Sequence, residues 1–248
     1  MLVDVHAHME HPLFKNDLKE VLARAEQAGV KTIISSGTNP HLNIKTLELA
    51  KQFQIIKPAL GIYPTDGLVL SDKEFDDALQ FIRNNKKNMI AIGEIGLDFQ
   101  EAKDKAKEQE HNFLKLLGLA EELNLPVIIH SRKAEERVIA ALESSKLKKI
   151  VLHCFSGNMN LIKRAEANGW MFSIPCNITM SSHFQSLVKQ VSMNQLLTET
   201  DAPFLPPVKG ERNEPKNVSQ TISKICEIKC LDREEAENMI FMNFQKTF

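Results

Sequence analysis

Eight short runs of β-type residues recur along the chain, and segments with helical periodicity lie between them. Successive runs start about 20 to 37 residues apart, which leaves room for one helix in each interval. Several runs, such as Val127-Ile128-Ile129, are apolar on both faces, as strands of a parallel sheet covered by helices must be. The runs are residues 2–7, 31–35, 55–62, 89–94, 126–130, 149–153, 170–174 and 195–200.

This count of strand–helix units favours a (β/α)8 barrel of the TIM type over an open, doubly wound α/β sheet. Barrels of this class typically have about 250 residues, and the chain has 248. No glycine-rich phosphate loop follows the first run, although the doubly wound alternative often has one there. We therefore predict one barrel domain over residues 1–248. The longest irregular segment, residues 201–217, follows the eighth run and is interpreted as an active-site loop.

Composition excludes several classes of protein. Hydrophobic residues make up 43% of the chain and charged residues 25%, so the chain can bury a core and is not disordered. The chain has 31 Lys and Arg and 32 Asp and Glu, so its net charge is -1. This balance excludes a protein that coats long nucleic acid through an overall positive charge, but it does not exclude a local phosphate site. The four cysteines lie far apart in a long chain and are interpreted as reduced thiols. Without a membrane-length apolar run or a signal-peptide pattern, we expect a cytoplasmic protein with no membrane association.

Six side chains that can bind a metal ion stand at or near the carboxyl ends of predicted strands. Two of them, His6 and His8, are two residues apart on one strand and so point to the same face. Each of the six alone could instead be a histidine bonded to a carbonyl or an acid at a helix N-terminus. Their joint position favours a metal site, because barrel enzymes build active sites at this end of the strands. The six are His6, His8, Glu94, His130, His153 and Asp201.

Six ligands of mixed imidazole and carboxylate type are too many for one tetrahedral ion. They suit two ions about 3.5–4 Å apart that share one bridging carboxylate. Such a pair activates a shared water and stabilises attacking and leaving oxygens, which fits hydrolysis at phosphorus or at a carbonyl. We therefore predict two divalent metal ions as cofactors, and the ligand types are compatible with Mg²⁺, Mn²⁺ or Zn²⁺.

Several longer motifs accompany these residues along nearly the whole chain. They are VDVHAH (3–8), ALGIYP (59–64), AIGEIGLDF (91–99), Gln109 with Phe113, LAEELNLPVIIHSR (119–132), HCFSG (153–157), ETDAPFL (199–205) and RNEP (212–215). Together they resemble the TatD-type metal-dependent deoxyribonucleases of the amidohydrolase superfamily.

The resemblance implies a distorted (β/α)8 barrel with two metal positions that share Glu94. One position would be held by His6, His8, Glu94 and Asp201, and the other by Glu94, His130 and His153. The resemblance also implies a nuclease that acts on DNA, often from the 3′ end. In such an enzyme a metal-activated water attacks the phosphodiester and Asp201 accepts its proton.

The chain departs from the family pattern at two places. Tyr63 stands where the family commonly has His, and Thr179-Met180-Ser181 stands where it commonly has Thr-Phe-Lys after the seventh strand. Neither place is a metal ligand. We expect both departures to alter contacts with the substrate. Arg132 and Arg212 are the best candidates to bind phosphate, because a guanidinium offers paired donors. The alternative for each is a structural arginine on a loop.

We thus predict a metal-dependent hydrolase that trims DNA, or another nucleotide-containing substrate, from an end. The single Trp and single Tyr offer no extended stacking platform for a long strand, which favours engagement of an end. The same metal geometry leaves open a small-molecule amidohydrolase that acts on an amide, ester or lactone. A metal-binding protein without activity is disfavoured, because all six ligands and the proton acceptor are present. The sequence leaves the oligomeric state open.

Overall fold

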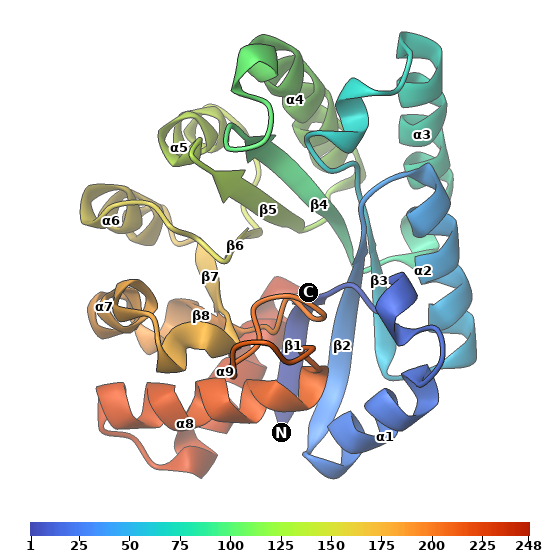
Figure 1. Cartoon of the computed structure of the whole chain (residues 1–248). Coiled ribbons are helices and arrows are strands. Elements are labelled where there is room, and N and C mark those ends of the chain that lie inside the picture. Colours follow the sequence, from blue (N-terminus) through green and yellow to red (C-terminus); the bar gives the residue numbers. More distant parts are fainter.

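The computed structural model describes residues 1–248 and contains eight parallel strands arranged around a barrel in the order of the chain (Figure 1). The strands are β1 (Leu2–Ala7), β2 (Val30–Gly37), β3 (Ile56–Leu60), β4 (Ala91–Asp98), β5 (Val127–Arg132), β6 (Ile150–His153), β7 (Met171–Ile174) and β8 (Leu196–Thr198). A doubly wound sheet would reverse its strand order, whereas this sheet never does. The predicted (β/α)8 barrel is therefore confirmed.

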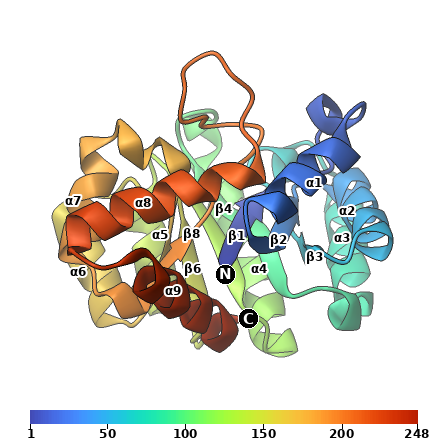
Figure 2. The same cartoon turned by 90° about the horizontal axis from the view of Figure 1, so that it is seen from below.

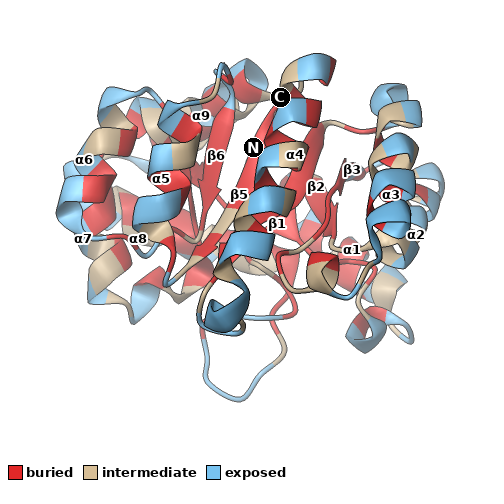
Figure 3. Cartoon of the chain, turned by 90° about the horizontal axis from the view of Figure 1, so that it is seen from above, coloured by how far each residue is buried: buried red, intermediate tan, exposed pale blue.

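Helices surround the strands on the outside of the barrel. They are α1 (Leu18–Gln27), α2 (Pro40–Gln52), α3 (Asp72–Asn84), α4 (Ala106–Leu123), α5 (Glu135–Glu143), α6 (Met159–Ala167), α7 (Ser182–Gln190), α8 (Val218–Lys229) and α9 (Arg233–Thr247). Figure 3 shows that the strands are buried, whereas each helix is buried only along the face that covers the barrel. None of the helices is long and apolar enough to cross a membrane.

Helix α3 illustrates how local sequence sets these elements. The Ser71 hydroxyl accepts a hydrogen bond from the Glu74 backbone N–H, and the Glu74 carboxylate accepts one from the Ser71 N–H. This capping box satisfies backbone donors at the helix N-terminus. The apolar residues Phe75, Ala78 and Ile82 follow at helical spacing and are all buried. The helix therefore begins at a defined residue and turns one defined face to the barrel.

Strand β4 is longer than the sequence predicts. The predicted run ends at Glu94, whereas β4 continues to Asp98 because residues 96–98 pair with residues 130–132 of β5. A register shift between Ile92 and Ile95 interrupts the regular pairing at this point. Glu94 therefore lies within a strand rather than at its end, at an irregularity of the kind that re-aims a side chain near an active site.

The first and last strands meet without a regular ladder, and side chains close the barrel there. The Thr198 hydroxyl donates to the Val3 carbonyl at 2.6 Å. The Thr200 N–H and hydroxyl both donate to the carboxylate of Asp4, at 3.0 and 2.5 Å. Burial raises the pKa of Asp4 to about 8, although these hydrogen bonds oppose the rise. The Asp201 N–H then donates to the His6 carbonyl at 2.9 Å, which brings these two residues together.

The longest irregular segment, residues 199–214, connects β8 to α8 and is called the β8–α8 loop below. Figure 2 shows this orange segment projecting from the barrel on the side away from both chain termini. The segment follows the carboxyl end of β8, so the loop stands over the end of the barrel where the six candidate ligands lie.

Candidate metal centre

The six predicted side chains come together at the carboxyl end of the barrel. Five of them line a cavity of about 490 Å³, and His6 is buried directly against the others. They come from β1 and the residue after it, from β4, β5 and β6, and from the start of the β8–α8 loop, five segments far apart in the chain. The five that line the cavity are His8, Glu94, His130, His153 and Asp201.

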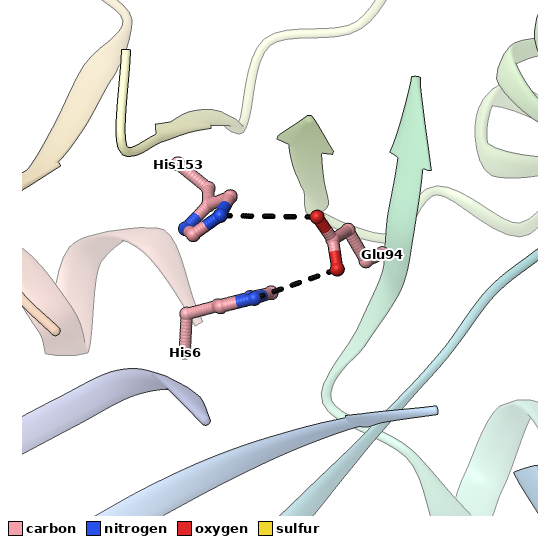
Figure 4. Close-up of side chains that lie close together, drawn as sticks. All are labelled: His6, Glu94 and His153. Atoms are coloured by element: carbon pink, nitrogen blue, oxygen red, sulfur yellow. Dashed lines mark ion pairs between the residues drawn. The ribbon is translucent and has the colours of Figure 1, made fainter. Parts of the chain in front are cut away.

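Glu94 lies between two sets of imidazole nitrogens. Its Oε2 atom is 3.6 Å from Nε2 of both His6 and His8. Its Oε1 atom is 2.8 Å from His130 Nδ1 and 3.8 Å from His153 Nε2. Figure 4 shows the carboxylate reaching His6 with one oxygen and His153 with the other. One oxygen of the carboxylate thus faces His6 and His8, and the other faces His130 and His153.

The donor atoms around His6 have the spacing of metal ligands. Asp201 Oδ1 lies 3.4 Å from Nε2 of both His6 and His8. A tetrahedral ion with bonds of about 2.1 Å keeps its ligand atoms about 3.4 Å apart. His6 Nε2 is also buried without a hydrogen-bond partner, although buried polar atoms nearly always have one. The residues present therefore fit a divalent metal ion.

Other residues bind the second nitrogen of these imidazoles. The Ser36 carbonyl oxygen lies 2.9 Å from His8 Nδ1, and the Ser36 hydroxyl lies 3.2 Å from His6 Nδ1. Glu199 Oε2 lies 2.8 Å from His153 Nδ1. Contacts of this kind set the orientation and tautomer of a metal-binding histidine. They leave Nε2 of all three rings directed at the cluster.

The electrostatics keep the two central carboxylates charged. Burial disfavours the charge of Asp201, but the facing His6 and His8 rings hold its pKa well below the usual range. Burial likewise opposes the charge of Glu94, and the surrounding imidazoles outweigh it and lower its pKa. Burial also opposes protonation of His153, but the adjacent Glu199 raises its pKa to about 9. Ionised carboxylates are the form that binds a metal ion.

With this geometry in place, comparison with known proteins decides the family. The chain matches the TatD related DNase family over residues 3–248. It belongs to this family. The resemblance found in its motifs is therefore confirmed.

Individual proteins also match over most of their length. The chain is 38% identical over 246 residues to an uncharacterized metal-dependent hydrolase of Methanocaldococcus jannaschii, covering 99% of this chain and 96% of that one. It is 35% identical over 258 residues to deoxyribonuclease TATDN3 of Homo sapiens (100% and 94%) and 31% identical over 235 residues to the 3′-5′ ssDNA/RNA exonuclease TatD of Shigella flexneri (90% and 90%). The crystal structure of YjjV, a TatD homolog of Escherichia coli, superimposes with a TM-score of 0.94 at 29% identity, covering 100% of this chain and 97% of that one.

The two arginines predicted to bind phosphate have different surroundings in this TatD-family barrel. Arg132 lines the cavity, and its Nε donates to Asp98 Oδ2 at 2.8 Å. Its Nη2 also donates to Glu101, whereas Nη1 makes no hydrogen bond within the chain. Arg132 therefore keeps free donors beside the cluster.

Arg212 is not among the residues that line the cavity. Its guanidinium donates to the Leu13 carbonyl at 2.6 Å and to Asp17 Oδ1 at 2.8 Å. It also binds Glu214 and lies over the Phe14 ring, 4.7 Å from the ring centroid. A guanidinium pairs with carboxylates as readily as with phosphates. These contacts join Arg212 to the segment that follows β1.

The sequence reasoning missed the residues that support the ligands. Glu199 and Asp98 are buried acids in largely apolar segments, and an acid in such a place needs a partner. That signal could have singled them out. Ser36 had no comparable signal, because its contact with His8 uses a backbone carbonyl that any residue carries.

Tyr63, which replaces the common family histidine, also lies in the cavity. Its hydroxyl donates to Asp98 Oδ2 at 2.7 Å and lies 3.2 Å from His130 Nε2. Asp98 thus contacts Tyr63, His130 and Arg132 together. Tyr63 is therefore part of a hydrogen-bonded group with Asp98, His130 and Arg132.

Proposed function

We propose that this TatD-family protein is a metal-dependent deoxyribonuclease that trims DNA from one end. The observation that carries the proposal is the position of Glu94, whose two oxygens face different histidines at the carboxyl end of the barrel. We assign Glu94 as the ligand shared by two divalent ions, Mg²⁺, Mn²⁺ or Zn²⁺. One ion would be held by His6, His8, Glu94 and Asp201, and the other by Glu94, His130 and His153.

When bound, two such ions supply an activated water and stabilise the charge on the phosphate oxygens. The chain's own residues orient the reaction around them. Asp201 is charged, and 14% of its side chain is exposed, so it is assigned as the proton acceptor. Arg132 is assigned to hold a phosphate oxygen through its free Nη1 donor. We make no such assignment for Arg212, which does not line the cavity.

The charges around the cavity favour attack at an end rather than along a strand. Arg132 is the single Lys or Arg among the lining residues, whereas Glu10, Asp66 and Glu101 add negative charge. A long polyanion would be repelled there, but a terminal nucleotide places only one or two phosphates beside the cations. The Shigella flexneri relative is named an exonuclease, which also supports attack at the end of a strand.

The same shortage of cations supports one alternative, a small-molecule amidohydrolase. A compact cavity with one arginine suits an amide, ester or lactone with little negative charge. The two functions differ in their substrates, so one experiment separates them.

The test is cleavage of a single-stranded DNA oligonucleotide, labelled at the 5′ or the 3′ end, by protein stripped of metal and resupplied with Mg²⁺, Mn²⁺ or Zn²⁺. We expect a metal-dependent ladder that shortens from the 3′ end. Asp201→Asn should lower the rate at least about 100-fold, because proton acceptance and a ligand charge are both lost. Asp77→Asn, which removes an exposed carboxylate on α3, should leave the rate unchanged.

Two results would contradict the proposal. One is an Asp201→Asn protein as active as the wild type. The other is a metal-loaded wild type that does not cleave DNA but hydrolyses an amide, ester or lactone. That result would establish the alternative function.

A further inference from the structure

An exposed aromatic ring stands at the mouth of the cavity. Phe204 lines the cavity, yet 48% of its surface is exposed. Its ring centroid lies 5.4 Å from that of His11, with the rings at 80°, and 6.0 Å from that of His8. We call His11 and Phe204 the aromatic edge. An exposed aromatic ring beside the candidate metal ligands is available for contact with a substrate that enters the cavity.

Buried hydrogen bonds hold Phe204 in this position. The Phe204 N–H donates to the Asp201 carbonyl at 2.8 Å. The buried Asn213 amide donates to the carbonyls of Thr200, Phe204 and Leu205 at 2.8, 2.7 and 3.1 Å. Both ends of the β8–α8 loop are thus tied to the residues that carry the ring. These contacts fix the backbone that carries the exposed ring.

The other half of the aromatic edge is tied to the same loop. His11 precedes the short 3₁₀ helix η1 (Pro12–Phe14), and its Nδ1 accepts a hydrogen bond from the Leu13 N–H at 3.2 Å. Arg212, next to Asn213, donates to the Leu13 carbonyl and to Asp17. Arg212 is therefore a positioning residue that joins η1 to the β8–α8 loop.

The cavity offers both apolar and charged groups to a ligand. Leu42, Phe204 and Leu205 come from segments that follow β2 and β8. Tyr63, Arg132 and Glu101 come from β5 and the segments after β3 and β4. A nucleotide likewise joins a charged phosphate to a flat base.

We propose that Phe204 stacks the base of the terminal nucleotide while its phosphodiester lies at the candidate metal centre, with the His11 ring, at 80° to Phe204, supporting the Phe204 ring edge-on. The inference rests on the proposed function and adds to it the residues that recognise the strand end. Stacking on an aromatic side chain tolerates every base, because each base has a π-face. The aromatic edge therefore selects a strand end that carries a base without selecting its sequence.

The first test compares two oligonucleotides that differ only in whether the terminal nucleotide has a base. Phe204→Leu should raise KM for the base-bearing strand about ten-fold and leave kcat within about two-fold. The same variant should leave KM for the strand with a terminal abasic site unchanged. Phe204→Tyr should restore the wild-type KM, and Phe241→Leu, a matched change on α9 that does not line the cavity, should have no effect.

A second measurement reports on stacking without turnover. An oligonucleotide with a terminal 2-aminopurine and phosphorothioate linkages is titrated with metal-loaded protein. Stacking should quench the fluorescence with the wild type and with Phe204→Tyr, but not with Phe204→Leu. Equal quenching by the wild type and Phe204→Leu, or an equal change of KM for both strands, would overturn the proposal. A wild type that quenches but cleaves no DNA would overturn the proposed function and leave the stacking intact.

Discussion

At the scale of single residues, neighbouring side chains and carbonyls fix the orientation of the histidine ligands. Ser36 binds the second nitrogen of two histidines, and Glu199 binds that of His153. Glu199 also accepts a hydrogen bond from the Ser173 hydroxyl. A ring fixed in this way presents its free nitrogen without losing further conformational entropy when a metal ion binds.

Glu199→Gln tests this support. The variant keeps the size of the side chain but removes the charge that faces His153 Nδ1. We expect the affinity for Zn²⁺ or Mn²⁺ to fall about 10- to 100-fold, as measured by isothermal titration calorimetry. Glu227→Gln, an exposed change on α8, is the control. An affinity equal to that of the wild type would show that Glu199 does not support the site.

The two arginines show where residue-level prediction from sequence ends. The types and spacing of the histidines and acids indicated a metal centre, because few other roles need that set at strand ends. For Arg132 and Arg212 the residue type was equally informative, yet only Arg132 lines the cavity. Arg212 is bound by Asp17, which lies 195 residues away in sequence. Nothing local in the sequence reveals such a partner.

At the scale of elements, the irregular pairing of β4 with β5 sets the position of Glu94. Beyond the register shift, Gly96 pairs with His130 and has a φ of +153°. A Cβ atom on Gly96 would lie 1.9 Å from the His130 carbonyl oxygen. The two strands can approach here only because residue 96 has no side chain. The sequence predicted β4 but ended it at Glu94, because the extra pairing depends on this close approach.

Gly96→Ala should therefore destabilise the barrel. We expect the free energy of unfolding to fall by roughly 2–4 kcal/mol, because β4 and β5 must separate to accommodate the methyl group. Gly118→Ala on α4 is the matched control, since no atom lies within 4 Å of its added Cβ. That change should stabilise the protein by about 0.5–1 kcal/mol. Urea unfolding measures both, and equal stability of the two variants would contradict the account of the strand contact.

At the scale of the whole molecule, the site exists only when the barrel is closed. Its six candidate ligands come from β1, β4, β5, β6 and the β8–α8 loop, and Asp4 and Thr200 join the two ends of the sheet. The count of eight strand–helix units was enough to predict the barrel and the end at which the site lies. It was not enough to predict the closure, because that depends on a contact between residues 196 positions apart.

The central claim is that two divalent ions share Glu94, and anomalous diffraction from crystals grown with Mn²⁺ or Zn²⁺ tests it most directly. We predict two anomalous peaks about 3.5–4 Å apart, one beside each carboxylate oxygen of Glu94. One peak should also contact His6, His8 and Asp201, and the other His130 and His153. A single peak at full metal occupancy, or two peaks that do not share Glu94, would contradict the account.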